Sequence, residues 1–62
     1  MNQYLVARYE YNNEGLEYYD NWEIIEAKTK DEAVKICNEK NDYTYYTAKA
    51  VYMLTDKGAV VI

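Results

Sequence analysis

A helix-start signal in the middle of the chain constrains the fold more than any other feature. Thr29 is followed three residues later by Glu32, which is the pattern of a capping box, where the two side chains satisfy the free backbone N–H groups of a helix start. The apolar residues that follow recur at helical spacing and form the stripe expected to be buried: Ala33, Val34, Ile36 and Cys37. We expect the helix to end at 40–42, with Asn41 as its cap.

Strand-forming sequence lies on both sides of this helix. Four segments are rich in β-branched and aromatic residues, and turn-forming Asn, Asp and Gly residues separate them in pairs. The predicted strands are 3–11, 16–27, 43–54 and 59–62, and the predicted turns are 12–15 and 55–58. The order β-β-α-β-β predicts an α+β fold, a four-stranded, mostly antiparallel sheet with one helix on one face. Residues 1–62 are expected to form a single small domain.

The register of the first hairpin decides which side chains share a face, because a slip of one residue exchanges the two faces of a strand. A four-residue loop would set Glu10 opposite Glu17, and like charges in that position destabilise a sheet. We therefore favour the three-residue loop 13–15, which sets Arg8 opposite Asp20. The second strand is unusually long, so a bend or bulge is expected near Asp20 and the asparagine that follows it.

In the favoured register both faces of the hairpin are substantially apolar. One face pairs Val6 with Trp22 and Tyr4 with Ile24. The other face holds Leu5, Ala7, Tyr9, Tyr19 and Ile25. A single short helix covers only one face of a sheet, so the other is predicted to be half-exposed tyrosine or an interface.

The composition excludes most catalytic and metal-binding classes. Histidine is absent, and the single cysteine, Cys37, permits neither an intramolecular disulfide nor a thiolate zinc site. A chain of 62 residues has no room for a deep cleft in its own core. We therefore predict no enzyme activity, no cofactor and no metal, with Cys37 packed as a small core residue. The sequence shows neither a membrane span nor the basic start of a signal peptide, which predicts a cytoplasmic protein with no membrane partner.

Tyrosine is the anomaly of the composition, with nine tyrosines and no phenylalanine. Tyrosine suits positions where one end of the ring is apolar and the other is wet, such as an open sheet face or a protein interface. A third interpretation is base stacking on single-stranded nucleic acid by Tyr43, Tyr45, Tyr46, Lys49 and Tyr52. Such surfaces pair aromatics with basic grooves, so the acidic first hairpin argues against direct nucleic-acid binding.

The charge is unevenly distributed. The chain carries a net charge of −4, and residues 1–26 hold six acidic side chains against Arg8 alone. An acidic region attracts basic surfaces, although a charge of this size also serves solubility. Because a duplex presents phosphates at much higher density, we expect docking on a basic patch of a partner rather than full nucleic-acid mimicry.

The run 23–37 resembles a pattern of small phage and mobile-element proteins, in which a strand ending in Ala leads through a Thr or Ser cap and an acidic pair into an Ala-Val helix. The whole chain resembles phage-encoded inhibitors of the anti-defence, anti-CRISPR-like type, which are tiny, acidic and free of a catalytic set. This resemblance implies a bacterial or phage-infected cell. It also implies action by covering a host protein surface or by sequestering a small signal.

These observations lead to a hypothesis of a non-enzymatic protein-binding inhibitor or adaptor. It would block a basic, nucleic-acid-binding surface of a host defence protein through the acidic, tyrosine-rich hairpin. The predicted partner-binding residues are Tyr9, Glu10, Tyr11, Glu17, Tyr19 and Glu23. The alternatives are a dimer that sequesters a small ligand or nucleotide, and a single-stranded nucleic-acid-binding sheet. A homodimer is expected because the chain lacks disulfides, metal and a large core.

Overall fold

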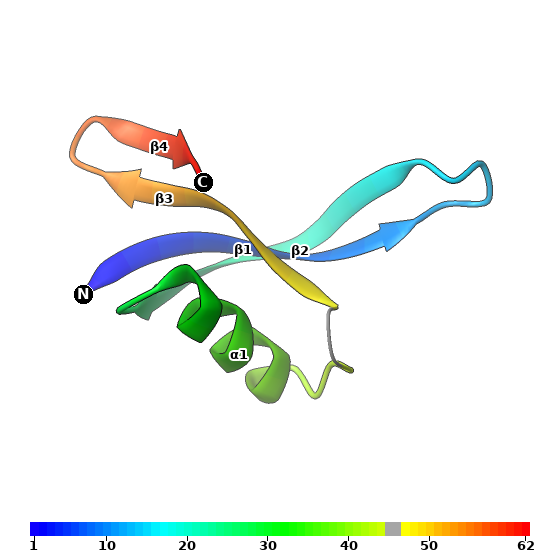
Figure 1. Cartoon of the computed structure of the whole chain (residues 1–62), viewed down its shortest axis with the longest axis horizontal. Helices are drawn as coiled ribbons and strands as arrows, with labels where there is room; N and C mark the ends of the chain where they lie inside the picture. The colour runs from blue at the N-terminus through cyan, green and yellow to red at the C-terminus, as the bar shows by residue number, and fades with distance from the viewer. Residues whose placement is uncertain (45–46) are drawn as a thin grey trace.

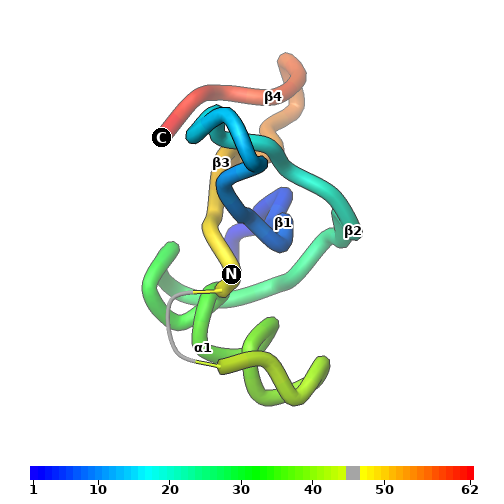
Figure 2. The backbone as a smooth tube through the Cα atoms, turned by 90° about the vertical axis from the view of Figure 1, so that its right-hand side faces the viewer, coloured from blue at the N-terminus to red at the C-terminus, as the bar shows by residue number. Residues whose placement is uncertain are grey.

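The computed structural model describes residues 1–44 and 47–62, and it confirms the predicted α+β architecture (Figure 1). The elements are β1 (Asn2–Tyr11), β2 (Glu17–Ala27), α1 (Lys30–Lys40), β3 (Ala48–Thr55) and β4 (Gly58–Val61). The strands form one antiparallel sheet in the order β2-β1-β3-β4. The helix contacts β1, β2 and β3, whereas β4 lies at the edge of the sheet beside β3, away from the helix (Figures 1 and 2).

The helix begins and ends where the sequence predicts. The hydroxyl of Thr29 accepts a hydrogen bond from the backbone N–H of Glu32 at 3.2 Å. At the other end Asn41 is the cap, and its backbone N–H donates to the carbonyl of Cys37 at 3.1 Å. Ala33 and Cys37 are buried on the predicted stripe, so the expectation that the cysteine is a core residue is confirmed.

The core between the helix and the sheet is built mainly from small side chains. Its buried members are Tyr4, Val6, Ile25, Ala27, Ala33, Cys37, Ala48 and Ala50. Among the described residues, the largest side chains that are fully buried are those of Val6 and Cys37. Small residues let α1 lie close to the strands, but they bury little apolar area, and hydrophobic stabilisation scales with that area.

The first hairpin has the predicted loop. The backbone N–H of Asn12 donates to the carbonyl of Leu16 at 2.8 Å, which leaves 13–15 as the loop. Gly15 adopts a φ of 78°, a left-handed conformation that favours glycine. The predicted pairing of Arg8 with Asp20 is also present.

Beyond that pair the predicted register is wrong by one residue. Val6 lies opposite Glu23 rather than Trp22, because the strands shift between Val6 and Arg8. Asn21 lies in this interval with a φ of 52°, so the bulge expected near this position is present. Because β2 has one extra residue at this point, every later side chain of the strand lies on the face opposite to the predicted one.

The bulge corrects the predicted membership of the two faces. On the helix side Tyr4 pairs with Ile25 and not with Ile24. Trp22 and Ile24 instead lie on the face that α1 leaves uncovered, where both are exposed. Ile25 is buried in the helix-side core rather than sharing a face with Tyr9 and Tyr19 as predicted.

The third predicted strand begins too early. β3 starts at Ala48, and Tyr43 and Thr44 precede it as a link from the helix, while the predicted strand positions 45 and 46 lie outside the described residues. Asn38 holds this link at both ends. Its carbonyl accepts from the N–H of Tyr43 at 2.9 Å, and its side chain accepts from the N–H of Ala48 at 3.1 Å. At Tyr43 a hydrogen bond to α1 therefore takes the place of the predicted strand pairing.

The molecule is elongated and thin, with extents of 37 × 24 × 15 Å. The end of the β1–β2 hairpin projects well beyond the helix (Figure 1). Among the residues that the structure describes, no second layer covers the sheet face opposite the helix or this projecting arm.

Candidate protein-binding surface

Five aromatic side chains form a continuous row on the sheet face opposite the helix. The ring centroids of consecutive members are separated by 5.8, 6.0, 5.7 and 6.1 Å in the order Tyr11, Tyr9, Tyr19, Trp22 and Tyr52. β1, β2 and β3 each contribute to it. These separations are typical of favourable aromatic pairs. We call these five residues the aromatic row.

A lysine from β3 lies against the middle of the aromatic row. The Nζ of Lys49 is 5.4 Å from the ring centroid of Tyr9 and 5.7 Å from that of Tyr19. It also lies 3.3 Å from Oε1 of Glu17. Cation–π contacts and an ion pair therefore hold the same ammonium group.

The tyrosine hydroxyl completes this arrangement. The Oη of Tyr19 donates to Oε1 of Glu17 at 2.5 Å and accepts from Nζ of Lys49 at 3.4 Å. The hydrogen bond from Tyr19, together with the one from Lys49, holds the pKa of Glu17 below its usual range. Bonding to that carboxylate raises the pKa of Tyr19. Near neutral pH the carboxylate is ionised and the phenol protonated, so the geometry is fixed by complementary partners.

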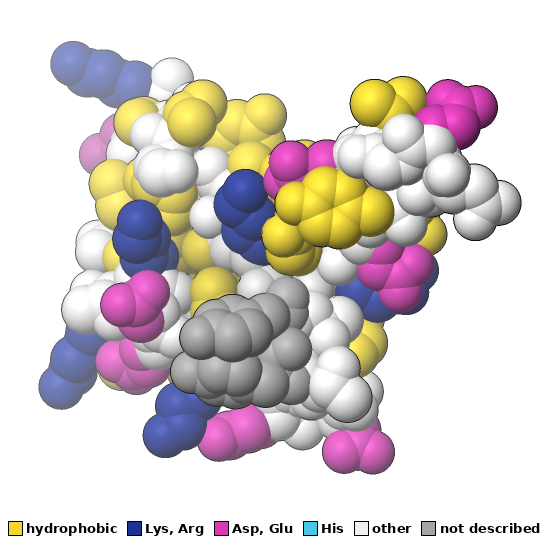
Figure 3. Space-filling model, turned by 45° about the vertical axis from the view of Figure 1, so that its right-hand side comes forward, with side chains coloured by type: hydrophobic (Ala, Val, Ile, Leu, Met, Phe, Trp, Pro, Cys, Tyr) yellow, Lys and Arg dark blue, Asp and Glu magenta, His cyan; other side chains and the backbone are white. Residues whose placement is uncertain are grey.

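The aromatic row is partly packed and partly open. Beneath it Ala7 is fully buried, and Tyr9, Tyr19 and Tyr52 are half-buried. In contrast, Trp22 is 44% exposed and Tyr11 is 62% exposed. The half-buried rings of Tyr9 and Tyr19 connect these two exposed rings, and exposed apolar surface that is continuous marks interaction sites. The space-filling view shows hydrophobic side chains at the surface beside charged ones, including at the end of the projecting arm (Figure 3).

The opposite face of the projecting arm carries a charged network. Arg8 forms a two-pronged ion pair with Asp20, with Nε–Oδ1 and Nη2–Oδ2 distances of 2.8 and 2.6 Å. Its Nη1 lies 2.7 Å from Oε1 of Glu10, whose other oxygen accepts from the hydroxyl of Tyr18 at 2.7 Å. The Arg8 hydrogen bond lowers the pKa of Asp20. Glu10 therefore belongs to this network and not to the aromatic row.

Glu23 ties β2 to the end of the helix. Its Oε1 accepts from Sγ of Cys37 at 3.2 Å and from Nδ2 of Asn41 at 2.8 Å, and its Oε2 lies 3.1 Å from Nζ of Lys40. Burial alone would raise the pKa of Glu23, but these three hydrogen bonds together lower it. Burial and the nearby carboxylate raise the pKa of the Cys37 thiol to about 11, so it stays protonated at neutral pH.

The structure thus brings four of the six predicted binding residues onto one face: Tyr9, Tyr11, Glu17 and Tyr19. Glu10 lies on the other face, and the carboxylate of Glu23 is bonded to residues at the end of the helix. The predicted register placed Trp22 on the face opposite Tyr9 and Tyr19, so Trp22 was not among the predicted binding residues. A register that counted the expected bulge as one extra residue of β2 would have placed Trp22 on the face of Tyr19.

The residues predicted for nucleic-acid binding are not gathered in the same way. Lys49 and Tyr52 lie with the aromatic row, whereas Tyr43 packs against the helix-side core. Tyr45 and Tyr46 lie outside the described residues.

The acidity of the first hairpin is largely compensated within the chain. Glu10 and Asp20 are paired with Arg8, and Glu17 and Glu23 are each paired with a lysine. These internal partners reduce the charge that the hairpin offers to a basic surface. Glu14, in the loop at the end of the arm, is exposed.

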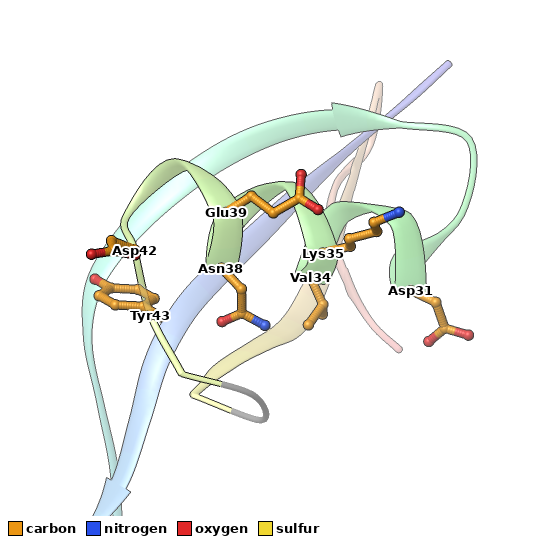
Figure 4. Close-up of a pocket in the computed structure, with 7 residues that line it drawn as sticks. All are labelled: Asp31, Val34, Lys35, Asn38, Glu39, Asp42 and Tyr43. Carbon is orange, nitrogen blue, oxygen red and sulfur yellow. The ribbon is translucent and has the colours of Figure 1, made fainter.

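A separate open groove lies beside the helix and is lined by Asp31, Val34, Lys35, Asn38, Glu39, Asp42 and Tyr43 (Figure 4). Asn38 and Val34 face the link to β3, while Lys35 and Glu39 point away from it (Figure 4). The amide of Asn38 is already bonded to the backbone of Ala48. Within the described part of the chain, no group of three or more Cys, Asp or Glu side chains is placed to hold a metal ion. The groove residues that the structure describes therefore form no metal site.

No helix within residues 1–44 and 47–62 is long and apolar enough to cross a membrane. No family model matches the chain, and comparisons with curated proteins and with solved structures give no match.

Proposed function

We propose that this chain is a non-enzymatic protein-binding protein, an inhibitor or adaptor, whose contact surface is the aromatic row. One observation carries the proposal: five aromatic side chains are contiguous on a sheet face that no other described element covers. Tyrosine and tryptophan dominate the binding energy of protein interfaces. Because these rings stand on paired strands and contact one another, little conformational entropy is lost when a partner binds.

Within this surface the roles differ with exposure. Trp22 and Tyr11 present the most accessible rings and would supply the apolar contact area. Glu17 and Lys49 would give a polar rim whose charges balance each other. This balance favours a partner surface of mixed apolar and polar character over a wholly basic one. The proposed setting is the cytoplasm of a bacterial or phage-infected cell, and the resemblance of the sequence to phage-encoded inhibitors supports it.

A second candidate, binding of single-stranded nucleic acid, has one observation in its favour. Lys49 lies over the rings of Tyr9 and Tyr19, and stacking surfaces combine aromatic rings with cations. The net charge of −4 opposes approach to phosphates, so we rank this candidate below protein binding.

The test is affinity capture from a lysate of host cells, with and without nuclease, using the wild type and three variants. Tyr19→Ala and Trp22→Ala remove central members of the aromatic row. Lys57→Ala, in the β3–β4 turn, is the matched control because it lies outside the row. We expect one stoichiometric protein that survives nuclease, is retained by the control and is lost with both aromatic variants.

Two results would contradict the proposal. Capture that disappears with nuclease would favour the nucleic-acid candidate. Equal capture by all four proteins, each shown to be folded by circular dichroism, would place the binding surface away from the aromatic row.

A further inference from the structure

The two edges of the sheet are protected to very different degrees. The β2 edge carries acidic side chains along its length and is interrupted by the bulge at Asn21. Charges and bulges at an edge prevent pairing with other strands. The β4 edge has neither charged side chains nor a bulge. Every residue of Gly58–Val61 is exposed and uncharged, as is Ile62 after it.

The hydrogen-bonding groups at the β4 edge can be assigned from its pairing with β3. The backbone N–H of Ile62 donates to the carbonyl of Val51 at 3.2 Å. In an antiparallel pair, residues alternate between bonding to the neighbour and pointing away from it. Val60 therefore points its backbone groups toward β3, where it lies opposite Met53, whereas Ala59 and Val61 point theirs outward.

We propose that this edge pairs antiparallel with β4 of a second copy of the chain, around a two-fold axis at Val60. That register sets Ala59 of one copy opposite Val61 of the other, so the residues with free backbone groups meet each other. Each such pair exchanges both of its N–H···O=C bonds. The result is a continuous sheet with β4 of each copy at its centre.

Charge and burial favour a second copy as the occupant of this edge. An identical β4 brings no charge, so no like-charge repulsion opposes the pairing, whereas two β2 edges would set acidic strands against each other. Pairing would also cover side chains that are now in solvent, namely Val60, Val61 and Ile62, which are 46%, 74% and 40% exposed. A chain whose core is this small gains from additional burial.

The symmetry has a structural consequence. A two-fold axis between antiparallel strands of one sheet stands perpendicular to the sheet. Both helices then lie on one side of the dimer and both aromatic rows lie on the other. The dimer does not depend on the proposed partner binding, but it would present that surface twice.

The experiment is sedimentation of the full chain from about 10 µM to about 1 mM, because a short strand interface belongs to the weak, reversible class. We expect the mean mass to rise with concentration from 7.4 kDa toward twice that value. Val60→Lys and Val60→Glu each set two like charges directly across the axis. Each should weaken dimerisation by at least about tenfold.

Mixing the two variants is the sharpest step. Opposite charges then meet across the axis, so the mixture should form a heterodimer that neither variant forms alone. This rescue also shows that both variants are folded. Leu16→Lys is the matched control, since it places the same charge on an exposed apolar residue of the other hairpin and should leave the dimer unchanged.

Three results would overturn the proposal. One is a wild-type chain that stays monomeric up to the highest concentration. Another is a Val60→Lys variant that dimerises as well as the wild type. The third is a mixture of folded variants that gives no heterodimer, which would exclude the register centred on Val60.

Discussion

The two faces of this sheet use opposite kinds of side chain, although the same strands supply both. Of the eight buried core residues that the structure describes on the helix side, four are alanine and one, Tyr4, is aromatic. The open side carries the aromatic row over the single buried alanine, Ala7. The core under the helix buries the ring of Tyr4, whereas five rings stand together on the open side. The position of these five rings on the open side supports the proposal that they contact a partner.

One residue sets this division along β2. Asn21 takes a positive φ, which asparagine tolerates better than most residues, and the strand gains a bulge there. After it, Glu23 and Ile25 face the helix while Trp22 and Ile24 face outward. The contrast between the faces can therefore be tested with neighbouring residues of one strand.

The largest expected effect comes from truncating the two neighbouring isoleucines of β2. Ile25 is 5% exposed, and Ile25→Ala should lower the free energy of unfolding by about 2–4 kcal/mol. Ile24 is 56% exposed, and Ile24→Ala should change it by no more than about 0.5 kcal/mol. Chemical denaturation measures both. Equal losses, or a larger loss at Ile24, would mean that the bulge does not divide the faces as described.

The next effect concerns the carboxylate that joins the sheet to the helix end. Glu23→Gln removes the charge that accepts from Cys37 and Asn41 and pairs with Lys40, so it should cost about 1 kcal/mol near neutral pH. Because the folded protein lowers the pKa of Glu23, its contribution is present above the ordinary value of 4.5 and is lost as pH falls through the folded pKa.

Denaturation of wild type and variant between about pH 7 and pH 3 checks this. The difference in unfolding free energy should be constant at the upper end and should shrink in acid. Part of the acid dependence should remain in the variant, since Glu17 and Asp20 also have lowered pKa values. A difference that grows on acidification would show that the sign assigned to Glu23 is wrong.

The smallest effect concerns the open face. Lys49→Met keeps an unbranched apolar stem against Tyr9 and Tyr19 but removes the cation and its ion pair with Glu17. Because the lysine side chain is 48% exposed, solvent screens these interactions, and the loss in stability should be about 0.5 kcal/mol. A loss as large as that for Ile25→Ala would show that the open face stabilises the fold as much as the core does.

Local signals in the sequence predicted most of the fold. The cap at Thr29 and the loop ending at Gly15 depend on residues close together in the chain, and both were correct. The pairing of Arg8 with Asp20 followed from avoiding like charges and was also correct. The pairings beyond Asn21 failed because the register was extended through the bulge without allowing for the extra residue.

The candidate site was predictable only in part, for a related reason. Alternation along a regular strand brings Tyr9 and Tyr11 together, and both were found. Glu10 and Glu23 were included because they are charged. Glu10 pairs with Arg8, two residues away on the same strand, whereas the partners of Glu23 lie at the end of the helix. The contact of Glu10 could be inferred from its own strand, but that of Glu23 could be assigned only once the packing of β2 against the helix was known.

The most direct test of the account uses the only tryptophan of the chain, Trp22, which stands in the aromatic row. Its fluorescence should be measured with acrylamide quenching, first alone and then with the captured partner. In the free chain we predict red-shifted emission and efficient quenching, and with the partner a blue shift and strong protection. A partner that binds while the emission and quenching of Trp22 stay unchanged would contradict the claim that the open face is the binding surface.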